Sequence, residues 1–125
     1  MAVAGEVWRV NFGPFEFDDG QVSLTVGGEI DDGRPAVVVN APSVTHNGLR
    51  IVVPVTDWKT YHQPDVYVPL SPTPTNGLTK SSSAVTPQLK SVATERFERR
   101  LGVLSADEFD RVLTGVLVSL GLTGS

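Results

Sequence analysis

The hydrophobic and polar positions along the chain predict a sheet of short strands. Residues 6–12 alternate polar residues with Val and aromatic residues, which is typical of a half-buried strand. Residues 34–40 contain three successive valines and predict a strand that is buried on both faces. Residues 82–91 predict a weaker strand, because Pro87 cannot donate a hydrogen bond to a neighbouring strand. Further strands are expected at 49–54, 65–70 and 99–104.

Glycine, proline and asparagine divide these strands. Residues 15–26 can form a small hairpin that turns at Asp19-Gly20, because glycine tolerates the positive φ of such turns. Residues 27–33 are rich in Gly and Asp and are expected to be irregular. Asn47-Gly48 predicts a turn between the strands at 34–40 and 49–54, so these two strands are expected to pair. Loops are expected at 56–64 and 71–77.

The end of the chain predicts one amphipathic helix over residues 105–121. Ser105 and Glu108 have the spacing of a capping box, and Gly121 is placed to end the helix. Apolar residues recur at spacings of three and four between these points and form one stripe. The predicted fold is therefore α+β: a small β-barrel of five to six mostly antiparallel strands with the helix packed on it. Residues 1–125 are expected to form a single domain.

The composition is that of a globular protein. The chain has 125 residues, of which 40% are hydrophobic and 19% charged. No apolar run approaches the ~20 residues that cross a bilayer, and the N-terminus lacks a signal pattern, so we expect a cytoplasmic protein without membrane contact. The absence of cysteine excludes disulfides, thiol nucleophiles and cysteine-ligated metals.

Charge is distributed unevenly along the chain. The formal net charge is −4, which argues mildly against a nucleic-acid partner. However, residues 1–33 carry seven acidic residues and one basic residue, whereas residues 34–125 carry seven acidic and nine basic residues. The acidity is thus confined to the first quarter, and the remainder is weakly basic.

The sequence contains none of the common motifs that bind a cofactor or a metal. There is no phosphate-binding loop with its lysine and no dinucleotide-binding glycine motif. His46 and His62 lie far apart without carboxylates at ligand spacing, so they are expected to be surface or loop histidines. No nucleophile elbow supports a Ser–His–Asp triad. We therefore expect neither a metal nor a cofactor.

Arg34 and Thr56 are the candidate pair. Arg34 enters a buried strand after a glycine-rich loop, and Thr56 leaves the next strand. Antiparallel pairing of these strands would bring the two side chains to one end of the sheet. A guanidinium and a hydroxyl placed there can bind an oxyanion or a phosphate. The alternative is structural, because arginines at strand starts often only stabilise the fold.

An ordered set of motifs covers nearly the whole chain and resembles the MazF/PemK (Kid-like) toxins of bacterial type II toxin–antitoxin systems. The best matched of them is Gly33-Arg34-Pro35-Ala36-Val37-Val38-Val39. The other matching segments are 5–8, 10–14, 28–29, 52–56, 76–78, 88–97 and 101–105. This family has an SH3-like, CcdB-like barrel, which agrees with the fold class expected from the strand pattern.

The resemblance implies a metal-independent endoribonuclease that cleaves single-stranded RNA. The essential arginine and threonine of the family match Arg34 and Thr56, and a glutamate used by some members matches Glu29. In such a reaction the 2′-hydroxyl attacks the adjacent phosphorus and leaves a cyclic phosphate and a 5′-hydroxyl. Arginine is a poor proton acceptor, so we prefer Glu29 as general base. The family is also described with the arginine as acid and base, and the sequence leaves both assignments open.

The resemblance also suggests RNA-binding residues. Trp58, Lys59 and Tyr61 follow Thr56 in a loop that faces RNA in this family, although the aromatic residues could instead cover the barrel mouth. Gln88 and Lys90 are further candidates. Basic residues at 96, 99 and 100 are expected to be solvated, with an antitoxin surface as the alternative.

The family further implies a homodimer that binds RNA in a groove between subunits and an acidic antitoxin that blocks this groove. Two other functions remain open: a CcdB-like gyrase poison on the same fold, and a catalytically silent module. The sequence departs from the family in its long acidic segment at 15–33 and in Pro87, which stands where relatives often carry an acidic residue.

Residues 15–32 carry six carboxylates, and our hypothesis is that they form a lid that repels RNA phosphates. Deleting residues 16–26 should then increase the rate of RNA cleavage at low salt, and high salt should reduce the gain. Initial rates on a short RNA would measure this. An unchanged or lower rate at low salt would argue against inhibition by this segment.

Overall fold

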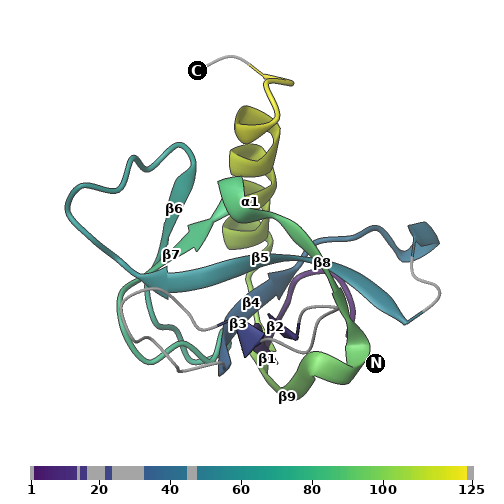
Figure 1. Cartoon of the computed structure of the whole chain (residues 1–125). Coiled ribbons are helices and arrows are strands. Elements are labelled where there is room, and N and C mark those ends of the chain that lie inside the picture. Colours follow the sequence, from purple (N-terminus) through teal and green to yellow (C-terminus); the bar gives the residue numbers. More distant parts are fainter. Residues whose placement is uncertain (1, 14, 17–21, 24–32, 45–47, 124–125) are drawn as a thin grey trace.

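The computed structural model describes residues 2–13, 15–16, 22–23, 33–44 and 48–123. Its core is a seven-stranded antiparallel sheet with one C-terminal helix (Figure 1). The sheet strands are β1 (Glu6–Asn11), β4 (Gly33–Val38), β5 (Leu49–Asp57), β6 (Tyr67–Leu70), β7 (Ser82–Val85), β8 (Lys90–Ala93) and β9 (Phe97–Val103). The remaining elements are the pair β2 (Phe15–Glu16) and β3 (Val22–Ser23), the 3-10 turns η2 (Pro42–Val44), η3 (Thr86–Gln88) and η4 (Thr94–Arg96), and α1 (Ala106–Ser119).

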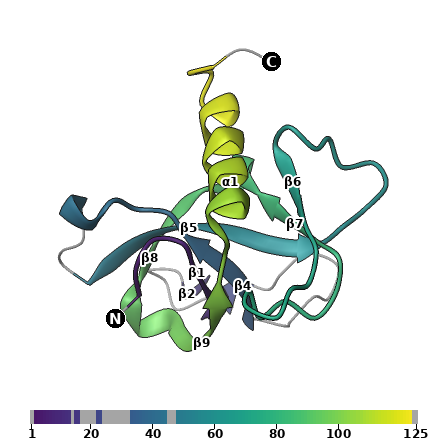
Figure 2. The same cartoon turned by 180° about the vertical axis from the view of Figure 1, so that it is seen from behind.

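The long strand β5 organises the sheet. The strand order is β6-β7-β5-β4-β1-β9, and β8 also pairs with β5. β7 pairs with the end of β5 and β8 with its start, so the sheet divides into two arms around this strand (Figures 1 and 2). The outermost strands of the order, β6 and β9, are not neighbours, and the sheet is open. The predicted fold class is confirmed, but the barrel is not closed.

The predicted strand at 82–91 is two strands in the structure. Pro87 lies within η3, which separates β7 from β8. A proline cannot donate to a ladder and fixes its own φ near −65°, so the chain leaves the sheet at this residue. The sheet consequently has more strands than the five to six predicted.

Other element boundaries shift by a few residues. The strand predicted at 65–70 begins only at Tyr67, because the N–H groups of Val66 and Tyr67 both donate to the Gln63 carbonyl in a turn. The strand predicted at 99–104 is β9 and begins at Phe97. The predicted hairpin at 15–26 is present as the β2–β3 pair, and its expected turn at Asp19-Gly20 lies outside the described residues.

Both faces of the central sheet are buried, as the valine run of β4 predicts. Val37 belongs to one core together with Val7, Val53 and Val112, and the last of these comes from α1. Ala36 and Val38 belong to a second core, on the other face, with Val10, Val52 and the flanking rings of Trp8 and Phe97. Successive residues of a strand point to opposite faces, so β4 contributes alternately to the two cores.

The helix prediction is confirmed in type and in its ends. The Ser105 side chain accepts a hydrogen bond from the Glu108 N–H, and the Glu108 side chain accepts one from the Ser105 N–H. Gly121 follows the helix with a φ of 73°, the left-handed conformation that ends a helix. The last turns of α1 project away from the strands (Figures 1 and 2). No helix in the described part of the chain is long and apolar enough to cross a membrane.

Asn76 connects this helix to the loop between β6 and β7. Its side chain is fully buried and donates to Glu108 Oε2 (3.0 Å) and to the Ser71 carbonyl (2.9 Å). Its Oδ1 accepts from the N–H groups of Thr73 (3.1 Å) and Leu78 (3.0 Å). Four hydrogen bonds to one buried amide fix the path of the loop against the N-terminus of α1.

Replacing Asn76 with Ala should therefore lower the free energy of unfolding by at least about 3 kcal/mol, because several buried polar groups lose their partners together. Thr75→Ala is the matched control: its side chain is exposed, so the change should stay within about 0.5 kcal/mol. Urea denaturation followed by circular dichroism measures both. Equal stabilities of the two variants would contradict this role of Asn76.

Candidate active site

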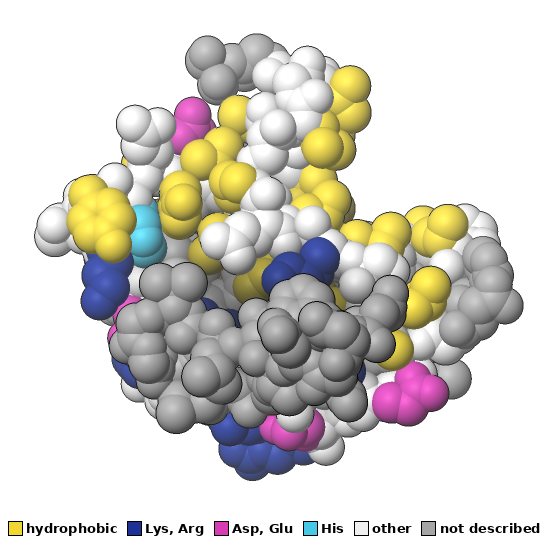
Figure 3. Space-filling model, viewed as in Figure 1, with side chains coloured by type: hydrophobic (Ala, Val, Ile, Leu, Met, Phe, Trp, Pro, Cys, Tyr) yellow, Lys and Arg dark blue, Asp and Glu magenta, His cyan; other side chains and the backbone are white. Residues whose placement is uncertain are grey.

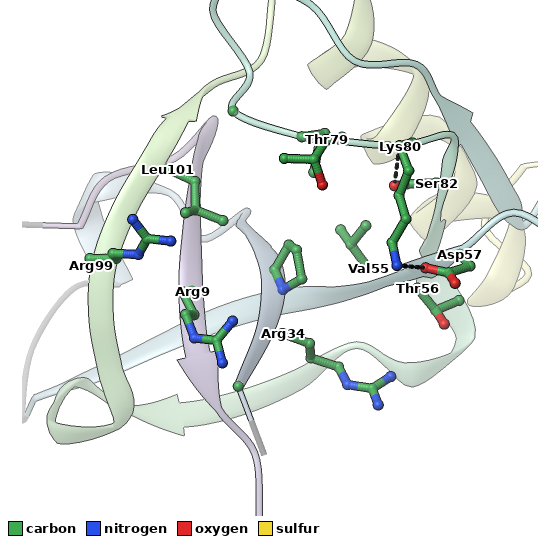
Figure 4. A pocket seen from close by; sticks show the side chains of 14 residues that line it. Arg9, Arg34, Val55, Thr56, Asp57, Thr79, Lys80, Ser82, Arg99 and Leu101 are labelled. Carbon is green, nitrogen blue, oxygen red and sulfur yellow. Dashed lines mark hydrogen bonds and ion pairs between the residues drawn. The ribbon is translucent and has the colours of Figure 1, made fainter. Parts of the chain in front are cut away.

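A cavity of about 400 Å³ lies where β1, β4, β5 and β9 meet the loop before β7 (Figure 4). Its walls combine basic side chains with small and apolar ones. The lining residues are Arg9, Gly33, Arg34, Pro35, Val55, Thr56, Asp57, Gly77, Leu78, Thr79, Lys80, Ser82, Arg99 and Leu101. The cavity thus contains both members of the candidate pair that the sequence suggested.

The register between β4 and β5 brings Arg34 and Thr56 together. Ala36 pairs with Pro54 and Val37 with Val53, so the same register continued by two residues places position 34 opposite position 56. Neighbouring strands lie about 4.8 Å apart, and opposite residues point to the same face. Both side chains line the same cavity, and Figure 4 shows them projecting from adjacent strands to the same side.

Thr56 is held on its other side by β7. It pairs with Ser83, and the next residue, Asp57, pairs with Ser82. Asp57 forms an ion pair with Lys80 (3.0 Å), and Lys80 comes from the loop before β7. The β5–β7 ladder thus holds the backbone at Thr56, two residues beyond the end of the β4–β5 ladder at Pro54.

Arg9 and Arg99 are cavity residues that sequence reasoning missed. They lie opposite one another on β1 and β9, and both line the cavity. Arg99 was expected to be solvated, and Arg9 was taken as one of the polar positions of an alternating strand. The signal for Arg9 was a basic residue at a polar position of a predicted strand, and in the structure this strand pairs with the strand of Arg34. Which strands are neighbours, however, is a property of the fold.

Arg99 is exposed, as expected, whereas Arg96 and Arg100 form hydrogen bonds with other parts of the chain. Arg96 Nη1 donates to the Asn11 carbonyl (3.1 Å). Arg100 Nε donates to Glu6 Oε2 (2.8 Å), on the opposite side of β9 from Arg99. Partial burial alone would raise the pKa of Glu6, but hydrogen bonds from Trp8, Val3 and Arg100 lower it below its ordinary value.

The charge of the cavity is opposite to that of the chain. Among its described lining residues, Arg9, Arg34, Lys80 and Arg99 are basic and only Asp57 is acidic. The chain as a whole has a net charge of −4. The cavity therefore attracts anions locally, and the overall charge is no guide to its ligand.

An aromatic cluster follows Thr56 in the loop after β5. The imidazole of His62 stacks on Tyr67 with ring centroids 4.4 Å apart, and Trp58 and Tyr61 meet it edge-on. His62 Nδ1 accepts from the Lys59 N–H (3.1 Å) and lies 2.8 Å from Ser83 Oγ. His62 is a loop histidine, as one of the two predicted alternatives had it, but it is buried and not on the surface.

The remaining predicted residues lie outside this cavity or outside the described residues. Three predicted RNA-binding residues follow Thr56 closely in the sequence but do not line the cavity: Trp58, Lys59 and Tyr61. Gln88 is exposed in η3. Lys90 pairs with Val52, so it is four residues along β5 from Thr56, or about 13 Å.

Two further predictions involve residues that the structure does not describe. Glu29, the preferred general base, and His46 lie outside the described residues. In the described part of the chain, no group of three His, Cys, Asp or Glu side chains is placed to bind a metal ion.

Comparisons with known proteins identify the class to which this fold and site belong. A family model described as PemK-like, MazF-like toxin of type II toxin–antitoxin systems matches residues 4–120. The endoribonuclease MazF9 of Mycobacterium tuberculosis (strain H37Rv) is 33% identical over 128 residues, which cover 98% of each chain. The chain belongs to the PemK-like, MazF-like family of toxins.

Solved structures share the fold. An endoribonuclease in complex with its cognate antitoxin from a mycobacterial species superposes with a TM-score of 0.71 at 15% identity, over the whole of both chains. MazF from Deinococcus radiodurans (Form-I) gives 0.66 at 22% identity and 94% coverage of each chain. The Mycobacterium tuberculosis toxin MazF-mt6 gives 0.63 at 21% identity and covers 77% of this chain and 94% of its own. At these identities the likeness concerns the fold.

Proposed function

We propose that this chain is a metal-independent endoribonuclease toxin that cleaves single-stranded RNA. The observation that carries the proposal is the placement of Arg34 and Thr56 on adjacent strands in one cavity that is predominantly basic. A guanidinium offers paired donors to phosphate oxygens, and a threonine hydroxyl adds a third. Family membership and the relative named an endoribonuclease support the same assignment.

The reaction uses a nucleophile that the RNA supplies. The 2′-oxygen bonds to the adjacent phosphorus and loses its proton, while the bond from phosphorus to the 5′-oxygen breaks and that oxygen takes up a proton. The products are a 2′,3′-cyclic phosphate and a 5′-hydroxyl. The protein has to orient these groups and stabilise the charge that accumulates on the phosphate oxygens. DNA lacks the attacking hydroxyl and is not a substrate.

Arg34 and Thr56 are the proposed phosphate-binding residues. Arg34 binds the non-bridging oxygens through its planar fork, and Thr56 donates its hydroxyl to one of them. Glu29 remains our proposed general base, five residues before Arg34, because a carboxylate accepts a proton at neutral pH and a guanidinium does not. The alternative, with Arg34 as acid and base, predicts that Glu29→Gln retains most of the activity.

RNA bases on either side of the cut are proposed to bind the loop after β5. The Tyr61 side chain is 78% exposed, yet its ring is fixed edge-on against His62. An exposed but held ring is a suitable surface for stacking an unpaired base, at ~1–3 kcal/mol per base. Trp58 and Lys59 extend this surface, and Gln88 and Lys90 would contact more distant phosphates of the same strand.

The proposed partners are a second copy of the chain and an acidic antitoxin, and the proposed location is the cytoplasm, where RNA is found. The solved structures of relatives include the mycobacterial endoribonuclease in complex with its cognate antitoxin and MazE-MazF from Deinococcus radiodurans. The basic cavity suits an acidic peptide as well as RNA. Hydrophobic side chains are exposed at the C-terminal end of α1 and just beyond it (Figure 3), namely Leu117 in the helix and Leu120 and Leu122 after it. Such a stripe at the projecting end of a helix suits burial in a homodimer.

Cleavage of a single-stranded RNA in EDTA tests the activity. Arg34→Ala and Thr56→Ala should each lower the rate at least ~100-fold, because each removes a donor to the developing charge. Arg111→Ala, on the exposed face of α1, is the matched control and should retain full activity. Sequencing the new 5′ ends identifies the cut site. If both variants still arrest growth, the chain acts as a gyrase-type poison instead. If the wild-type protein neither cuts RNA nor arrests growth, it is a silent module.

The dimer is tested by light scattering at known protein concentration. Leu120→Glu should weaken the association ~10- to 100-fold, because it removes a buried leucine worth ~1.5–3 kcal/mol and introduces a charge. Thr75→Glu introduces the same charge at an exposed position of the loop between β6 and β7, outside α1, and should leave the dimer intact. Equal masses for the two variants would exclude this face of α1 as the interface.

A further inference from the structure

Three arginines cross the neighbouring strands β9, β1 and β4. Arg99 pairs with Arg9 across β9 and β1, and Arg9 pairs with Pro35 of β4, the residue after Arg34. All three arginines line the cavity, and Figure 4 shows Arg9 and Arg99 beside one another, with Arg34 further toward Thr56. The positive charge of the site thus extends two strands beyond the proposed catalytic pair.

Arg9 and Arg99 place two like charges opposite one another on β1 and β9. Like charges directly opposite one another on neighbouring strands destabilise a sheet. Glu98 forms an ion pair with Arg9 (2.9 Å), but both side chains are about two-fifths exposed, which weakens the pair. Arg99 forms no ion pair or hydrogen bond with any described residue. Arg99 therefore adds a positive charge to the cavity directly beside the Arg9 guanidinium, and a bound anion can neutralise it.

Gly33 makes room for Arg9. A Cβ at position 33 would overlap the guanidinium of Arg9, so this group lies directly against the backbone of β4. The contact brings a cation from β1 within one residue of Arg34. It also gives a reason for a glycine at the start of β4 that does not depend on an unusual φ.

Arg9 and Arg34 approach the cavity from opposite faces of β4. Arg9 shares a face with Pro35, whereas Arg34 lies on the face of Val10 and Ala36. The two guanidinium groups thus stand on either side of the strand rather than converging on one point. A phosphate bound by Arg34 and Thr56 therefore lies on the other face of β4 from Arg9 and Arg99.

We propose that Arg9 and Arg99 form a second phosphate-binding subsite, which holds a phosphodiester next to the one that is cleaved. This inference rests on the proposed ribonuclease function. The subsite binds the RNA backbone without reading its sequence. It does not touch the reacting atoms, so it contributes mainly to substrate affinity and to the alignment of the strand in the cavity.

The test uses a short RNA that contains the mapped cut site and a 2′-deoxy nucleotide at the attacking position, so that it binds without being cleaved. Arg9→Gln and Arg99→Gln should each weaken binding at low salt about tenfold. Each should also reduce the slope of log affinity against log salt by about 0.7, the value for one lost phosphate contact on a single strand. Arg100→Gln is the matched control, because it changes the same charge on the other side of β9.

Replacing the phosphates of this RNA one at a time with neutral methylphosphonates locates the subsite. One position adjacent to the cut should weaken binding to the wild-type protein but not to Arg9→Gln. If no position distinguishes the two proteins, or if Arg100→Gln has the same effect, the subsite does not exist. Cleavage of the all-ribose RNA by the wild-type protein is measured separately, so a failure of the nuclease proposal is recognised independently.

Gly33→Ala provides a second variant that keeps every charge. The added methyl should displace the Arg9 guanidinium and weaken binding in the wild-type background. In the Arg9→Gln background it should have little further effect, because the displaced group is already absent. Equal effects in the two backgrounds would show that Gly33 acts on the strand or on Arg34 and not through Arg9.

Discussion

The antiparallel pairing of β4 with β5 is the constraint on which the site depends. Continued two residues beyond the Ala36–Pro54 pair, its register places position 34 opposite position 56. A shift of one residue would move each valine of β4 from one packed core into the other and would place the guanidinium and the hydroxyl on opposite faces. Packing of apolar side chains in the two cores therefore holds the register on which the site depends.

The electrostatics of this protein are local. A chain with net charge −4 has a cavity in which described basic residues outnumber acidic ones by four to one. Charges act mainly over about 8–10 Å at physiological salt, so a ligand in the cavity responds to Arg9, Arg34, Lys80 and Arg99 more than to distant carboxylates. The acidic segment near the N-terminus can influence this balance only if it lies near the cavity.

Much of the fold was readable from the sequence because the signals were local. The capping box of α1, the alternation of β1 and the valine run of β4 each combine a short pattern with one physical cause. The prediction from Pro87 was only partly correct. The residue was expected to weaken one strand, and in the structure it separates two strands that pair with opposite ends of β5. The loop position of His62 was predicted, but its burial was not, because the burial depends on Tyr67 and Ser83, which lie on two strands.

The sequence by itself predicted the pairing of the two strands that carry Arg34 and Thr56, because strands that follow one another in the chain usually lie side by side. Residues 39–48 between them are longer than a tight turn and include η2. The sequence also determined the helix and its ends, which depend on residues three or four positions apart. Only the tertiary structure decided that β1 and β9 lie beside β4, and hence that Arg9 and Arg99 line the same cavity. These strands are brought together by burial of the shared cores, and the sum of such long-range contacts cannot be read from any local pattern.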